Sequence, residues 1–211
     1  MIIAVDGPAA AGKGTLARAL AARYDFAFLD TGSLYRAVAY RVLSAGRSPT
    51  DEEAALRAAR TLDISGIEDH LLRTAEVGAA ASLVAVMQPV RDAILGFQRQ
   101  FAHQPPGNRK GSVLDGRDIG TAVCPDADVK LYVTARPEIR ARRRWLELKG
   151  SGSALTEAQV LEEVKDRDRR DMERATSPLK PAADAHLLDT SDLSIEAAFD
   201  AAVAIIGKVH R

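Results

Sequence analysis

The chain has 211 residues, and its 29 lysine and arginine residues balance its 29 aspartate and glutamate residues. Hydrophobic residues make up 46% and charged residues 27%, which is typical of one globular domain with a sizeable core and excludes wholesale disorder. The zero net charge argues against a protein whose main task is to coat nucleic acid or an anionic membrane, and the single cysteine, Cys124, excludes an internal disulfide.

The apolar runs of the chain are short. None approaches the roughly 18 residues that a membrane-spanning helix needs. Met1 leads directly into the apolar run 2–5 without a basic segment before it, which argues against a secretory leader. We therefore expect a cytoplasmic protein with no nucleic-acid or membrane partner, and we expect it to be a monomer.

The first half of the chain alternates short apolar runs with helical patterns. Apolar runs at residues 2–6 and 26–29 predict strands that are buried on both faces. Helical spacing predicts a first helix that begins at Lys13. It predicts three further helices at residues 33–45, 50–62 and 77–101. Thr50 and Glu53 match a capping box at the start of the third of these helices. Pro89 interrupts the fourth, which predicts two helices or one kinked helix.

The second half continues the alternation. Strands are expected at residues 113–115, 129–133 and 185–188, and helices at 137–149, 156–174 and 194–206. Thr156 and Gln159 match a second capping box, and the Gly-Ser-Gly-Ser run at 150–153 predicts a flexible link. Alternating strands and helices imply an α/β fold in three layers, with a five-stranded parallel sheet flanked by helices.

The strongest functional signal lies between the first strand and the first helix. It is the run Gly7, Pro8, Ala9, Ala10, Ala11, Gly12, Lys13, Gly14 and Thr15. Glycines at such a turn free backbone N–H groups to surround an anion at the helix N-terminus, and the lysine reaches the β and γ phosphates of a triphosphate. In the general motif Ser or Thr follows the lysine directly. The Gly-Lys-Gly-Thr form found here looks like the nucleoside monophosphate kinase branch.

A second motif opens the second helix. The segment 30–36 reads Asp-Thr-Gly-Ser-Leu-Tyr-Arg and follows a predicted strand, at the sheet edge where ligands of open α/β folds bind. Arg36, on the first helical turn, is a candidate clamp for a second phosphate. The alternative is a plain helix start with Thr31 or Ser33 as the N-cap and a solvated arginine.

A third motif, Asp-Gly-Arg-Asp at residues 115–118, follows the third predicted strand. An acid at this strand end is where P-loop enzymes hold the shell of Mg²⁺. We therefore expect Thr15 and Asp115 to be the magnesium ligands, Asp115 acting through water. A type I turn that closes a strand explains Asp-Gly but not the Arg117–Asp118 pair that flanks it.

Nine arginines lie within the 39 residues from 136 to 174, together with nine acidic residues. Two helices joined by the link at 150–153 would form a hinged lid that carries these arginines. Arg167, Asp171 and Arg174 recur at positions i, i+4 and i+7 and so share one helix face. A solvated, salt-bridged helix pair is the alternative. A nucleic-acid patch at 142–144 is disfavoured, because it has no interleaved aromatic residues and the domain as a whole is not net basic.

In combination these segments resemble bacterial cytidylate kinases over nearly the whole chain. The segments that carry the resemblance are 6–15, 30–36, Ser82 with Arg91, 115–121, 140–144, 167–179 and 187–195. The resemblance implies that the γ-phosphate of ATP is transferred to CMP or dCMP, with Mg²⁺ as the metal. It also implies a core (1–33, 107–139 and 176–211), a monophosphate-binding region (about 34–106) and a lid (about 140–175) within one domain, 1–211.

The resemblance assigns roles to individual residues. The residues that would read cytosine are Thr31, Arg91, Asp118 and Arg174. The residues that would hold the CMP phosphate are Arg36 and Arg117, and those that would meet its ribose are Ser82, Arg167 and Asp171. The lid arginines that would face the transferred phosphoryl, besides the catalytic Lys13, are Arg143 and Arg170. Adenine would rest near Ser191 and Asp192.

The sequence departs from the family pattern at two places. Thr31 stands where many relatives have serine, which keeps the hydroxyl and adds a methyl group. The segment 62–77 leaves little room for the small β-rich insert that many bacterial relatives carry in the monophosphate-binding region. The contribution of that insert to CMP binding must be reduced or replaced.

The chemistry needs no general base, because a phosphate nucleophile is already an oxyanion. Catalysis is expected to rest on positioning and on neutralisation of charge around the γ-phosphoryl group. A GTPase-like switch is one alternative, but the chain lacks the Asn/Thr-Lys-x-Asp segment that such a protein uses to read its base. A kinase for a sugar or a shikimate-like acid would need an aspartate base and fewer arginines, and UMP kinase activity is a third alternative.

Overall fold

The computed structural model describes residues 1–63, 67–150 and 152–209. In this part of the chain, five parallel strands form one sheet in the order β2-β3-β1-β4-β5. The strands are β1 (Ile2–Asp6), β2 (Ala27–Asp30), β3 (Ser112–Asp115), β4 (Val129–Thr134) and β5 (His186–Asp189). Each lies within one or two residues of the range predicted from the apolar runs, and the predicted α/β class with a five-stranded parallel sheet is confirmed.

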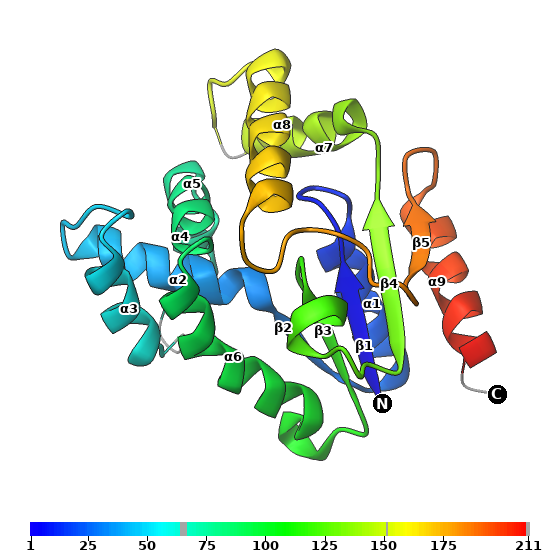
Figure 1. Cartoon of the computed structure of the whole chain (residues 1–211). Coiled ribbons are helices and arrows are strands. Elements are labelled where there is room, and N and C mark those ends of the chain that lie inside the picture. Colours follow the sequence, from blue (N-terminus) through cyan, green and yellow to red (C-terminus); the bar gives the residue numbers. More distant parts are fainter. Residues whose placement is uncertain (64–66, 151, 210–211) are drawn as a thin grey trace.

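The helices connect the strands and cover both faces of the sheet (Figure 1). They are α1 (Lys13–Tyr24), α2 (Thr31–Ser44), α3 (Glu52–Arg60), α4 (Asp69–Leu72), α5 (Ala75–Val84), α6 (Gln88–His103), α7 (Pro137–Gly150), α8 (Glu157–Glu173) and α9 (Ile195–Val209). A 3₁₀ turn, η1 (Pro106–Asn108), precedes β3, and a π-helical turn, η2 (Ile119–Val123), follows it. The sequence did not predict the π-helical turn.

Alternation along β1 divides the core between the two faces of the sheet. Ile3 and Val5 pack with residues of α1 and α9 on one face. Ile2 and Ala4 pack on the other face with Ile119 of η2 and with residues of β3 and α6. Both faces of the central strand are therefore buried, which explains its continuous apolar sequence.

A separate helical cluster extends from the sheet beyond β2. Its core consists of buried residues of α2, α3, α5 and α6 (Figure 1). The predicted break near Pro89 is confirmed, because α5 and α6 are two helices and the proline lies in the first turn of α6. There it removes no intrahelical hydrogen bond.

One predicted helix cap was wrong. Asp51, and not Thr50 with Glu53, caps α3, since its carboxylate accepts a hydrogen bond of 2.9 Å from the N–H of Ala54. Asp30 caps α2, which excludes the alternative in which Thr31 or Ser33 is the N-cap. In each case a neighbouring aspartate places a stronger acceptor at the helix N-terminus.

The capping box at the start of α8 is confirmed. Thr156 and Gln159 exchange hydrogen bonds of 2.9 and 3.3 Å between side chain and backbone. In the segment 62–77, the described residues form α4 and the start of α5. Residues 64–66, like Ser151 of the predicted flexible link, lie outside the described part of the chain.

By length and apolar content, no individual helix of the described residues qualifies as a membrane span. The pair of α5 and α6 passes the same criterion only when the two helices are counted together, and they are bent by 99° at the break between them.

Candidate active site

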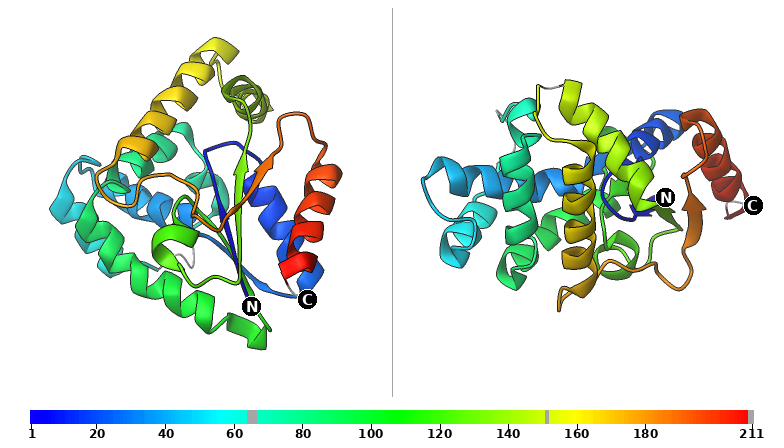
Figure 2. Two further views of the ribbon diagram at one scale, coloured as in Figure 1. Left: turned by 45° about the vertical axis from the view of Figure 1, so that its right-hand side comes forward. Right: turned by 90° about the horizontal axis from the view of Figure 1, so that it is seen from above.

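The carboxyl ends of the central strands carry the predicted site, and α7 and α8 lie across this edge of the sheet (Figure 1). Seen from above, α8 lies between the helical cluster of α2 to α6 and the loop that follows β1 (Figure 2). Ligands of open parallel sheets bind at this edge, between segments that leave neighbouring strands in different directions.

The loop between β1 and α1 has the backbone geometry of an anion cradle. Gly7 has a φ of 141°, and a Cβ atom built on it would lie 1.9 Å from the carbonyl oxygen of Val133, so only glycine fits. Gly12, the residue before α1, has a φ of 87°, and no side chain of the described residues caps the first turn of α1. The N–H groups of that turn are therefore free to bind an anion.

Lys13 is held inside this loop. Its side chain is 5% exposed, its Nζ donates a 2.8 Å hydrogen bond to the carbonyl of Pro8, and it lies 3.9 Å from Oδ1 of Asp115. Burial and the neighbouring Arg117 guanidinium lower the pKa of Lys13 to about 7, against the opposing effect of Asp115. A cation so poorly solvated gains a great deal from contact with a phosphate oxygen.

Asp115 ends β3 directly opposite the start of α1. Burial raises the pKa of its carboxyl group, and Oδ1 is buried without a hydrogen-bond partner among the described residues. A Cβ atom on Gly14 would lie 3.3 Å from Oδ2, so the helix start and the carboxylate are in close approach. The described residues include no group of three or more His, Cys, Asp or Glu side chains that would bind a metal alone. A carboxylate oxygen without a hydrogen-bond partner beside a phosphate cradle fits a Mg²⁺ ion that takes its remaining ligands from phosphates and water.

The segment that opens α2 forms the neighbouring wall. Asp30 caps the helix through Ser33 and also binds Arg36, whose Nη2 lies 2.6 Å from Oδ2 of the aspartate. The Nε of Arg36 is buried and has no partner in the described part of the chain. Thr31 donates a 2.7 Å hydrogen bond from its hydroxyl to the carbonyl oxygen of Asp115, which ties this wall to β3.

Two arginines from distant segments meet beside this wall. Arg117, after β3, donates from Nε to Oδ2 of Asp171 on α8 at 3.1 Å. Burial, and then the charge of Arg117, lower the pKa of Arg167 to about 10, and the Nε of Arg167 is buried without a partner. Positive charge therefore exceeds its local counter-charge here, and such a place is suited to a phosphate group.

A third set of charged side chains, which is almost fully buried, surrounds Asp118. Arg91 of α6 donates from Nη2 to Oδ2 of Asp118, and Arg174 brings its Nη2 within 3.5 Å of Oδ1. The side chains of all three residues are at most 8% exposed. Ser82, on α5, is also buried and bonds within its own helix to the carbonyl of Gly78 at 3.4 Å.

A cavity of about 50 Å³ adjoins this group, lined in part by Tyr35, Gln98 and Asp118. The guanidinium carbon of Arg91 lies 5.7 Å from the centre of the Tyr35 ring. Sequence reasoning missed Tyr35 and Gln98. Tyr35 stands inside the 30–36 motif, whereas no signal marks Gln98, which lies mid-helix in α6.

The expected donor-side residues lie around the ends of β4 and β5. Arg143 donates to the hydroxyl and carbonyl oxygens of Thr190 at 3.1 and 2.7 Å. The hydroxyl of Ser191 accepts a 2.8 Å hydrogen bond from the backbone N–H of Arg136. Asp192 forms a bidentate ion pair with the guanidinium of Arg136. Arg170 is exposed on α8 and lies outside the sets of charged side chains described above.

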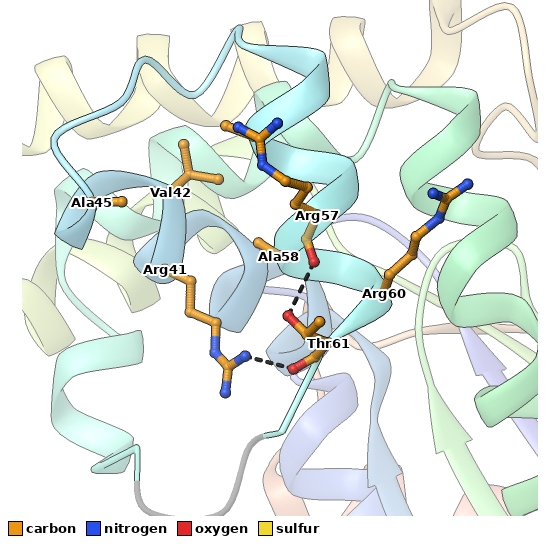
Figure 3. A pocket seen from close by; sticks show the side chains of 8 residues that line it. Arg41, Val42, Ala45, Arg57, Ala58, Arg60 and Thr61 are labelled. Atoms are coloured by element: carbon orange, nitrogen blue, oxygen red, sulfur yellow. Dashed lines mark hydrogen bonds between the residues drawn. The ribbon is translucent and has the colours of Figure 1, made fainter.

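A hollow larger than the cavity beside Asp118 lies away from this edge, between α2 and α3 (Figure 3). It has a volume of about 500 Å³, and arginines 41, 57 and 60 line it above a floor of small apolar side chains. Arg41 donates to the carbonyl of Thr61 at 2.6 Å. None of the predicted site residues lines this hollow, so we do not place the chemistry there.

Two separate anion cradles face one another across the sheet edge. The glycine loop with Lys13 fits a triphosphate, and the arginines opposite it fit a second phosphate-bearing molecule whose flat polar part would reach Asp118. Fold and site together define a P-loop kinase in which both reactants carry phosphate.

Comparison with known proteins gives the family. A family model described as cytidylate kinase matches residues 3–208. The cytidylate kinases of Afipia carboxidovorans and Sinorhizobium medicae are each 55% identical, over 98% and 97% of this chain and 97% and 95% of their own lengths. The chain belongs to the cytidylate kinase family. Among solved structures, an uncharacterized protein from Eubacterium ventriosum aligns with a TM-score of 0.55 and 15% identity, over 99% of this chain and 98% of its own, which supports the fold alone.

Proposed function

We propose that the chain transfers the γ-phosphoryl group of ATP to CMP or dCMP and so produces ADP with CDP or dCDP. Membership of the cytidylate kinase family over nearly the full chain carries this proposal. The two facing anion cradles support it, because a nucleotide switch needs only one. The half-buried arginines opposite Lys13 likewise favour a phosphate acceptor over a sugar alcohol.

On the donor side, the proposal gives the loop from Gly7 to Thr15 the phosphates of ATP. Lys13 would bind the β and γ phosphates, and Ser191 with Asp192 would lie near adenine. Mg²⁺ would be held by Thr15 and, through water, by Asp115, and it would neutralise phosphate charge there.

On the acceptor side, each arginine group receives one part of CMP. Arg36 and Arg117 would hold the phosphate. The ribose would meet Ser82, Arg167 and Asp171. The cytosine ring would be read by Asp118 with Arg91 and Arg174, while Thr31, already bonded to the backbone of β3, would shape the edge of the pocket.

The transfer itself needs no proton-abstracting residue. The CMP phosphate oxygen attacks as an anion, and the protein positions it in line and neutralises the charge that spreads over the γ-phosphoryl oxygens. Water is the competing acceptor. The segment 140–175 is therefore proposed to close as a lid, bringing Arg143 and Arg170 toward the phosphates, over a core of residues 1–33, 107–139 and 176–211 and a monophosphate-binding region at about 34–106.

We further propose that the enzyme acts as a monomer in the cytoplasm, with its nucleotides as its only partners and without nucleic acid or membrane. The experiment that tests the proposed function is an ADP-release assay with ATP, Mg²⁺ and one acceptor at a time: CMP, dCMP, UMP or AMP. The proposal predicts rapid release with CMP or dCMP, and much slower release with UMP, with AMP and without acceptor. Equal release with and without CMP would contradict it.

A further inference from the structure

Arg140 is a buried arginine of α7 that none of the roles above includes. It is 3% exposed, and the described residues satisfy four of its donor positions. Its Nε donates to the carbonyl of Ala135 at 2.8 Å. Its Nη1 and Nη2 bind the two carboxylate oxygens of Asp168 at 3.0 and 2.6 Å, and Nη1 also donates to the carbonyl of Ala9 at 3.3 Å.

These contacts join three segments that the proposed reaction must coordinate. Ala9 lies in the loop that would hold the phosphates of ATP. Asp168 lies on α8, directly after Arg167 and one turn before Asp171, so its position fixes the face that α8 presents to the acceptor site. Ala135 belongs to the turn between β4 and α7, which anchors the guanidinium to the sheet.

Holding α7 against α8 does not require this ion pair. The two helices already share an apolar core of Ala141, Leu148, Val160 and Val164, with the Trp145 ring packed against it. A buried ion pair adds little to stability compared with apolar packing, since desolvation offsets its attraction. What the guanidinium supplies, and apolar packing does not, is the directed contact with the loop.

We infer that Arg140 is a positioning residue that couples the ATP loop to the acceptor-binding face of α8. It touches neither nucleotide at the sites proposed above. It sets the place of Ala9 relative to Asp168, and through Asp168 the place of Arg167 and Asp171. This inference rests on the proposed function, because it assigns to Arg140 the coupling between the proposed ATP site and the proposed CMP site.

The test uses Asp168→Asn and Arg140→Lys in the full-length enzyme. Asparagine keeps the shape of the aspartate but removes its charge. Lysine keeps the charge of the arginine but cannot bind both carboxylate oxygens of Asp168 and the carbonyl of Ala9 at once. Calorimetry would measure CMP binding with and without a non-hydrolysable imido analogue of ATP. In the wild type, the analogue should tighten CMP binding by a factor in the range of about 5 to 150 that is typical of coupled sites.

Both variants should lose most of this coupling, while CMP alone binds within about threefold of wild type. Turnover should fall roughly 10- to 100-fold, as expected when reacting groups are displaced by about 1 Å. The double variant should be no worse than the poorer single variant, because the residues act as one unit. Matched controls are Asp166→Asn and Arg169→Lys, which alter an exposed ion pair on α8 with a 2.9 Å contact.

Wild-type coupling in both variants, or turnover like that of the controls, would overturn the inference. Thermal stability lowered with coupling intact would show a purely structural role and would overturn it as well. Wild-type turnover of CMP is measured in the same series. Failure of the proposed function would therefore appear in the wild type, and failure of the inference only in the variants.

Discussion

At the scale of single residues, the site consists of charged side chains that are poorly solvated and only partly neutralised by opposite charges. Lys13 is buried with its pKa lowered to about 7, Arg167 is half-buried with its pKa lowered to about 10, and Oδ1 of Asp115 has no hydrogen-bond partner among the described residues. Groups with perturbed pKa values at one sheet edge are typical of an active site. Their cost to the fold is recovered when phosphates bind.

Replacement of Lys13 tests the charge that the loop supplies. Lys13→Ala should lower kcat by roughly 10²- to 10³-fold, because preorganised charge near a developing transition state contributes on that scale. Circular dichroism should show an intact fold, since the lysine is the first residue of α1, at the end of the loop, and is not part of the apolar core. The control is Lys165→Ala, which removes an exposed lysine on α8. Near-normal phosphoryl transfer by folded Lys13→Ala protein would remove the proposed role of the loop lysine.

Asp118 should decide between cytosine and uracil. In the proposed site its carboxylate would accept a hydrogen bond from the amino group of cytosine but would oppose the carbonyl oxygen of uracil, a buried mismatch that costs about 1–3 kcal/mol. Asp118→Asn adds an amide donor that suits uracil. The variant should therefore have a lower kcat/KM for CMP and a narrower CMP:UMP ratio. Both substrates are measured on both proteins at one concentration of Mg²⁺ and ATP, and an unchanged or wider ratio would place the cytosine contact elsewhere.

Asp6 predicts a pH dependence of stability. Burial raises its pKa from 3.8 to about 6, although its carboxylate accepts hydrogen bonds of 2.8 and 2.7 Å from the N–H groups of Ile119 and Gly120. The nearby Asp118 raises this pKa further and Lys13 lowers it. Between about pH 4 and pH 6 the folded state holds a proton that the unfolded chain has released. The contribution of Asp6 to stability therefore falls as pH rises through this window and is level above it.

Asp6→Asn has no proton to release at this position. Urea unfolding at pH 4, 5, 6 and 7 should show that the variant lacks part of the decline in unfolding free energy seen in the wild type between pH 4 and pH 6. The exposed Asp200→Asn serves as the control. If wild type and Asp6→Asn have the same pH slope, Asp6 does not titrate in this window.

At the scale of elements, each part of the site depends on where a helix or turn begins. Asp30 caps α2 and holds Arg36, so one carboxylate sets both the helix start and the arginine. The turn η2 receives hydrogen bonds at both ends, because Asp6 binds its first N–H groups and Arg99 donates to the carbonyls of Ala122 and Val123. Asp118, the residue before this turn, is thereby fixed in place.

The helix pair α7 and α8 should close over bound nucleotides. It has a small apolar core of its own and reaches the rest of the chain largely through polar contacts of arginines. Amide hydrogen exchange in both helices should slow markedly when a bisubstrate analogue binds, whereas β1, buried at the centre of the sheet, should change little. Equally strong protection with and without the analogue would indicate a fixed helix pair.

At the scale of the whole molecule, the sequence predicts what depends on short-range pattern. Apolar runs placed all five strands, and the Gly7–Thr15 loop was found because its glycines, lysine and hydroxyl are contiguous. The capping box at Thr50 was wrong because Asp51, one residue on, is a stronger cap than threonine.

Contacts between side chains that are distant in the sequence could be identified only from the structure. Arg140 and Asp168 are 28 positions apart, and their contact depends on how α7 packs on α8. Arg91 and Asp118 are 27 positions apart and meet because α6 begins near the carboxyl end of β3 and runs antiparallel to it, with Ala102 at its far end bonded to Ser112 at the start of β3. The family resemblance placed Arg91 and Asp118 in one pocket, but residue pattern alone had no means of doing so.

The central claim is transfer of phosphate between two nucleotides, and the most direct measurement follows the phosphate itself. ATP labelled at its γ-phosphate is incubated with the enzyme, Mg²⁺ and CMP, and the labelled products are separated. The account predicts that the label appears in the β-phosphate of CDP, with little in inorganic phosphate, and that Lys13→Ala slows its appearance. Label released chiefly as inorganic phosphate, at a rate that CMP does not change, would contradict the account.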